Sequence, residues 1–234
     1  MPDTTAATRP ESRRDLFLWG AVALSLAVAL TPWGRLALYP FTLFTTWVHE
    51  CGHALMATLL GGDVASVTIE PDTSGLTRSM TPDTLVVRGL VSTSGYLGAS
   101  VFGCVLLVAT RLERLARLII WTLGVLMLLS LVFWVRNLFG AGVVLTWGAA
   151  LIWLGRRGHG AVAQWVLSLL AVQVALNALY DIRILFSVSD GHSDALSMEK
   201  LFLLPYWFWA GGWMLASAVM VAATLWLTRT RPPR

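Results

Sequence analysis

Charged residues are scarce in this sequence of 234 residues. Asp, Glu, Lys and Arg together make up 13% of the chain, whereas hydrophobic residues make up 56%. Soluble domains carry about 25% charged residues, so the composition excludes an ordinary water-soluble fold. The few basic residues give a net charge of +4 and are dispersed at the ends of apolar runs. Arginine side chains at such positions reach towards lipid head groups, and we therefore expect no nucleic-acid partner.

The chain also has little cysteine. Cys51 and Cys104 are its two cysteines, and both lie within apolar runs. This number and spacing exclude a disulfide framework and a Cys-x-x-Cys metal-binding knuckle. The cysteines therefore do not indicate a redox compartment.

Long apolar runs are what the sequence has in abundance. A helix that crosses a hydrocarbon core of about 30 Å needs roughly 20 apolar residues. Seven runs of this kind follow one another, at about 15–34, 38–60, 91–110, 117–135, 138–155, 162–184 and 206–228. The predicted fold class is an all-α polytopic membrane protein with about seven transmembrane helices and the lipid bilayer as its surroundings. Residues 15–228 form one membrane-embedded domain between a mobile polar tail, 1–14, and a basic tail, 229–234.

The polar stretch after the second run has a different periodicity. Polar and apolar residues alternate between Asp63 and Glu70, and residues 71–75 have the composition of a turn. This pattern predicts a small β-hairpin directly after the second run. The β-favouring residues 85–87 add a further strand to a β-element of about 63–90. Because an open sheet edge cannot face lipid, we expect these strands at the membrane interface or against the helices.

The second run contains the sequence His49-Glu50-Cys51-Gly52-His53. Residues four apart share one face of a helix, so both imidazoles can bind the same metal ion. Zn²⁺ is the natural occupant, since it takes nitrogen ligands at about 2.0 Å and keeps one position for water in catalytic sites. Glu50 would deprotonate that water before its attack on a peptide carbonyl. Three ionisable groups at membrane depth are costly and need a shared function, which here is peptide hydrolysis.

A third protein ligand has to come from another part of the chain. Asp181 lies near the end of the sixth run, one helical turn after Asn177. If all seven runs cross the membrane, Asp181 and His53 lie towards the same side. Asp194 lies on that side too, but in a polar loop, which is more typical of a solvated carboxylate or a helix N-cap. We therefore expect Asp181 to complete the metal site, with Asp194 as the alternative, and Asp181→Ala to weaken zinc binding more than Asp194→Ala.

Further segments accompany the motif, namely Gly61-Gly62-Asp63-Val64, the turn region 71–77 and Ser94-Gly95-Tyr96-Leu97-Gly98. With them, the sequence resembles the site-2 protease family of intramembrane zinc metalloproteases, in particular its compact bacterial members. It differs from better-known members in having Tyr96 where they have proline, and in lacking proline and glycine around Asp181.

The resemblance implies a multi-pass protein of a bacterial cell membrane that cleaves another membrane protein. It also implies a small β-element after the motif helix. The implied roles are zinc ligation by His49, His53 and Asp181 and water activation by Glu50. Asn177, one turn before Asp181, and Gly95 are further candidates for contacts with the substrate or the ligands.

The predicted function is therefore an intramembrane zinc metalloprotease. Two other classes stay open: a zinc-binding membrane protein without proteolytic activity, such as a scaffold, an inhibitor or a metal-handling protein, and a transporter. Glu50 favours the enzyme, because a structural zinc site uses a fourth protein ligand and needs no general base. The sequence contains no repeated pair of broken helices of the kind that is typical of transporters.

Overall fold

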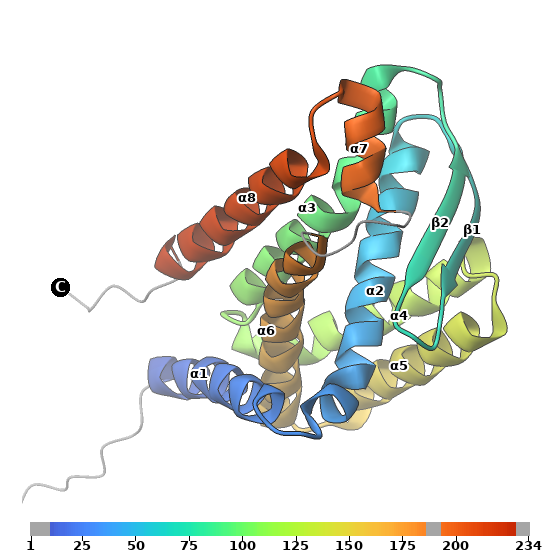
Figure 1. Ribbon diagram of the computed structural model, residues 1–234. Helices are drawn as coiled ribbons and strands as arrows, with labels where there is room; N and C mark the ends of the chain where they lie inside the picture. Colours follow the sequence, from blue (N-terminus) through green and yellow to red (C-terminus); the bar gives the residue numbers. More distant parts are fainter. Residues whose placement is uncertain (1–9, 186–192, 228–234) are drawn as a thin grey trace, which may run out of the picture.

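The computed structural model describes residues 10–185 and 193–227, without the side chains of residues 10–14, 113 and 178–185. In chain order the elements are α1 (Pro10–Ala29), α2 (Gly34–Leu59), β1 (Asp63–Ile69), β2 (Gly75–Met80), α3 (Leu85–Ala109), the short 3-10 helix η1 (Glu113–Leu115), α4 (Ala116–Phe133), α5 (Leu138–Arg157), α6 (Gly160–Leu185), α7 (Asp194–Phe202) and α8 (Tyr206–Leu227). Figure 1 shows α2 between α3 and α6 on one side and the two strands on the other.

Five of the described helices are long and apolar enough to cross a membrane, namely α3, α4, α5, α6 and α8. They correspond to five of the seven predicted runs. The apolar part of α1, Asp15–Ala29, is shorter and would extend only about 22 Å, less than the bilayer core. The motif helix α2 is long enough, but its histidines, glutamate and threonines make it less apolar than the five. Residues 10–14, which the sequence analysis assigned to a mobile tail, form the start of α1.

The predicted hairpin is confirmed, and glycine ends the helix before it. Gly61 has φ +79°, the left-handed conformation in which glycine commonly stops a helix. β1 and β2 pair antiparallel, with Val67 opposite Thr77 and a register shift between Val64 and Ser66. In the turn, the Asp72 carboxylate accepts hydrogen bonds from the backbone and the hydroxyl of Ser74.

The prediction of a further strand at residues 85–87 was wrong. These residues form the first turn of α3, and the β-element ends at Met80. Thr84 has an extended backbone, and its hydroxyl accepts a hydrogen bond from the Val87 N–H at 3.2 Å. This N-cap satisfies one of the free amide groups at the start of a helix, and it outweighs the weak preference of Leu and Val for a strand.

The outer edge of β1 is covered by the connection between α4 and α5. The Val67 N–H donates to the Trp134 carbonyl, and the Arg136 N–H donates to the Val67 carbonyl. The side-chain amide of Asn137 continues this pairing by binding both the N–H and the carbonyl of Ile69. The expectation that the strands lie against the helices is confirmed, and this edge of the sheet is satisfied.

The turn of the hairpin is attached to α2. The Tyr39 hydroxyl donates to the Pro71 carbonyl at 2.6 Å, and the Thr46 hydroxyl donates to the Thr73 carbonyl at 2.7 Å. The hairpin therefore has a fixed position along the helix that carries the His-Glu-x-x-His motif.

Among the side chains that the structure describes, the buried hydrophobic ones form two separate clusters. The larger includes residues of α1 to α6 and both flanks of the motif, such as Val48 and Ala54. The smaller joins α7 to α8 through Ala195, Met198 and Trp213. Because α7 packs in this second cluster and against α3, its N-terminal end is held beside the motif helix (Figure 1).

Candidate metal centre

His49 and His53 lie one turn apart on α2 and present their rings to the same point. Their Nε2 atoms are 3.1 Å apart, as the i, i+4 spacing predicts. The ring of His53 is also fixed from behind, because its Nδ1 lies 2.7 Å from the Val91 carbonyl on α3. A carbonyl can only accept, so Nδ1 carries a proton, and in the neutral imidazole the lone pair of Nε2 then faces the centre of the site.

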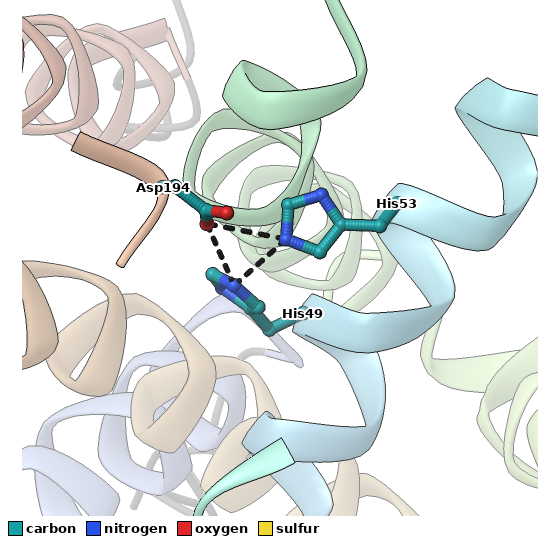
Figure 2. Close-up of side chains that lie close together, drawn as sticks. All are labelled: His49, His53 and Asp194. Carbon is teal, nitrogen blue, oxygen red and sulfur yellow. Dashed lines mark hydrogen bonds and ion pairs between the residues drawn. The ribbon is translucent and has the colours of Figure 1, made fainter. Parts of the chain in front are cut away.

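Asp194 brings the third ligand atom to the two histidines (Figure 2). Its Oδ2 lies 3.2 Å from the Nε2 of His49 and 3.1 Å from the Nε2 of His53. The expectation that Asp194 is a solvated carboxylate or an N-cap was wrong. Ser193 caps α7, since its hydroxyl accepts a hydrogen bond from the Leu196 N–H at 3.2 Å. This leaves the Asp194 side chain, 21% exposed, free to point at the histidines.

The three ligand atoms have the spacing that a zinc ion requires. They form a triangle with edges of 3.1, 3.1 and 3.2 Å. Zinc bonds of 2.0–2.1 Å in a tetrahedron give ligand-to-ligand distances of about 3.3 Å. Two imidazole nitrogens and one carboxylate oxygen are also a donor set of catalytic zinc sites, which leave the fourth position open. These residues therefore fit the metal that the motif predicts.

Gly95 on α3 faces the two histidine ligands and, having no side chain, leaves room for an ion in front of them. A Cβ atom at this position would lie 2.4 Å from the Nε2 of His53 and 2.5 Å from the Nε2 of His49. Any side chain here would occupy the space where a bound ion must sit. The next residue, Tyr96, packs edge-on against His49 with ring centroids 4.6 Å apart, and stacks on Trp213 of α8. The assignment of Gly95 to the surroundings of the metal site agrees with this geometry.

The environment of Asp194 favours its ionised form. Burial raises the pKa of the carboxyl group, but the charge of His53 and hydrogen bonds from both histidines outweigh it and hold the pKa well below its ordinary value. A carboxylate is the form that binds a metal ion. Asp194 is therefore ionised at neutral pH, and the histidines must be in their neutral form when they bind a metal ion.

Glu50 points to the neighbouring face of α2, where the hairpin lies. It is 5% exposed, and its carboxylate contacts the position of Gly75 and accepts a hydrogen bond from the Thr77 hydroxyl. Thr77 is a residue of this site that was not predicted from the sequence. Thr77 and Gly75 share one face of β2, because alternate residues of a strand do so, but nothing in the sequence links that face to Glu50.

The two residues proposed on the sixth run both belong to α6. Asn177 donates from its side-chain amide to the Thr45 hydroxyl at 3.0 Å, one turn before His49 on α2. It therefore contacts the helix that carries the ligands. The side chain of Asp181 lies outside the described residues, so its ligation stays a prediction. The described side chains bring Asp194, the alternative of the sequence analysis, to the histidines.

A family model described as Peptidase M50B-like matches residues 19–224. The chain belongs to the peptidase M50B-like family. This agrees with the resemblance to the site-2 proteases, and the match extends over the motif, the hairpin and Asp194. No curated protein and no solved structure matches the chain. Membership of a family of membrane metalloproteases, together with five apolar helices, identifies the chain as an integral membrane protein.

Proposed function

We propose that this M50B-like protein is an intramembrane zinc metalloprotease that hydrolyses a peptide bond in or near a transmembrane segment of another membrane protein. The observation that carries the proposal is the convergence of His49, His53 and Asp194 on one point, with Glu50 in the same turn of helix. Membership of the M50B-like family supports the same reaction class. The proposed setting is a bacterial cell membrane.

Each residue of the site has a separate task. His49, His53 and Asp194 would hold the ion, and zinc, when bound, polarises a water molecule and the carbonyl of the scissile bond. The Glu50 carboxylate takes a proton from the attacking water and gives it to the leaving amine. Its position on the neighbouring face of α2 keeps it beside the ligands without making it one of them. This division favours a catalytic site over a structural one, which has no use for a general base.

The position of α2 among apolar helices supports a reaction at membrane depth. α2 packs against α3, α5 and α6, all of which are apolar enough to cross a membrane. Surrounding helices and the hairpin can shield its polar residues from lipid, so α2 need not be apolar itself. We therefore propose that α1 and α2 enter the membrane together with the five apolar helices, giving about seven in all.

The test uses purified protein in proteoliposomes with a panel of single-span transmembrane peptides. Mass spectrometry detects cleavage, and elemental analysis measures zinc. We expect about one zinc per chain and peptide products from the wild type. Glu50→Gln should keep the zinc but form no products, since an amide cannot accept the proton of the water.

Glu70→Gln is the matched control, because Glu70 is an exposed carboxylate at the end of β1. It should cleave at the wild-type rate. Products that form equally fast with Glu50→Gln would refute the mechanism. Bound zinc without cleavage of any peptide would favour a non-proteolytic zinc protein.

A further inference from the structure

The hairpin makes a direct hydrogen bond to the proposed general base. The Thr77 hydroxyl on β2 lies 2.6 Å from Oε2 of Glu50 and 3.0 Å from the backbone carbonyl of Glu50. A hydroxyl has one proton, and the shorter distance and the charge of the carboxylate favour donation to Oε2. Because Glu50 is buried, this bond is made in a place where water competes little.

The other carboxylate oxygen packs closely against Gly75 in the same strand. A Cβ atom at Gly75 would lie 2.6 Å from Oε1 of Glu50 and 2.6 Å from its Cγ. Gly75 and Thr77 are two residues apart, so they lie on one face of β2. The strand therefore contacts the two oxygens differently. Thr77 donates a hydrogen bond to Oε2, whereas Oε1 lies against Gly75, where any side chain would displace the Glu50 carboxylate.

Thr77 is held in place by the neighbouring strand, β1. Its partner in the sheet is Val67, which is fully buried. The backbone of Val67 is bound in turn to Trp134 and Arg136 in the connection between α4 and α5. Thr77 thus lies on the inner strand of a sheet that is anchored to both α2 and the α4–α5 pair, and it cannot follow the movements of the Glu50 side chain.

We propose that Thr77 is a positioning residue for the reaction suggested above, on which this inference rests. Its hydroxyl fixes the Glu50 carboxylate through Oε2 and leaves Oε1 to accept the proton of the attacking water. A glutamate side chain has several rotatable bonds, and holding it in one conformation removes an entropic cost from the reaction. Thr77 acts through Glu50, to which its hydroxyl is hydrogen-bonded.

Three variants test this role in proteoliposomes, with the transmembrane peptide that the wild type cleaves fastest. Thr77→Val keeps the shape of the side chain and removes the donor. We expect its kcat to fall about 10- to 100-fold, with KM and zinc content within about 2-fold of the wild type, because misplacing a catalytic group by about 1 Å can cost 100-fold. Thr77→Ser keeps the hydroxyl and should recover most of the rate.

Thr68→Val is the matched control on the neighbouring strand. The Thr68 hydroxyl lies 3.4 Å from the Leu76 carbonyl, away from Glu50. This variant should keep the wild-type kcat. A wild-type kcat for Thr77→Val, or an equal loss in Thr77→Ser, would overturn the positioning role. An active Glu50→Gln would instead overturn the proposed function, so the two failures are distinguishable.

A measurement without substrate tests the hydrogen bond itself. Thermal unfolding compares Thr77→Val in the wild-type background and in a Glu50→Ala background. If the hydroxyl binds the carboxylate, Thr77→Val lowers Tm by at least about 2 °C more in the wild-type background, where the bond exists. Equal shifts in both backgrounds would show that Thr77 and Glu50 are not coupled, and the inference would fail whatever the peptides show.

Discussion

Gly95 offers a sharp test of the metal centre, because the space it leaves is the space that the ion would need. Replacing Gly95 with alanine adds one methyl group on α3, directly opposite His49 and His53. Alanine is the better helix former by about 1 kcal/mol. In a site without a metal function, the change should therefore be tolerated once the neighbours have adjusted.

The size of the effect follows from the contact distances. The added carbon would lie 2.4 and 2.5 Å from the two Nε2 atoms, where ordinary van der Waals contacts begin at 3.4 Å. The rings or α3 must therefore move by about 1 Å. Metal–ligand distances tolerate only about 0.2 Å. Losing a group that merely orients a ligand costs about 10- to 100-fold in metal affinity, so displacing two ligands should cost at least about 100-fold.

The assay is competition for zinc between the purified protein and a graded series of chelators. Gly98→Ala is the control on the same helix, since its Cβ atom would meet Gly52 at an ordinary 3.7 Å. We expect Gly98→Ala to keep wild-type zinc affinity and Gly95→Ala to lose zinc while retaining its helical circular dichroism. If Gly95→Ala holds zinc as tightly as the wild type, the ion does not sit between α3 and the histidines, and the geometric argument is wrong.

Two further predictions concern the third ligand. Asp194→Ala should weaken zinc binding by more than the 10- to 100-fold that is typical when a residue that only orients a ligand is lost, and Asp181→Ala should weaken it by less. This ranking is the reverse of the one expected from the sequence. The chelator series measures both affinities, and a greater loss in Asp181→Ala would move the third ligand to α6. Ser193→Ala removes the N-cap of α7, which should destabilise this helix by about 1 kcal/mol and lower zinc affinity about 5-fold. Ser193→Asp retains a capping group and should keep the affinity of the wild type. Equal zinc affinities for the two variants would show that the cap does not support Asp194.

Local patterns in the sequence determined several parts of this protein. The spacing of His49 and His53 fixes two ligands on one helix face, since this depends only on helical geometry. The alternation after Asp63 and the turn composition before Gly75 predicted the hairpin. The five apolar helices were also predictable, because length and hydropathy set them without reference to neighbouring helices.

Tertiary packing decided what local patterns leave open. Asp194 reaches the histidines because Ser193 caps α7 and because Met198 and its neighbours pack α7 beside α3. Thr77 meets Glu50 because the hairpin folds back along α2 and is anchored at Tyr39. A carboxylate in a polar loop and a threonine in a strand have no feature in sequence that marks such contacts. These contacts depend on how distant elements pack, whereas helix periodicity and turn composition act over only a few residues.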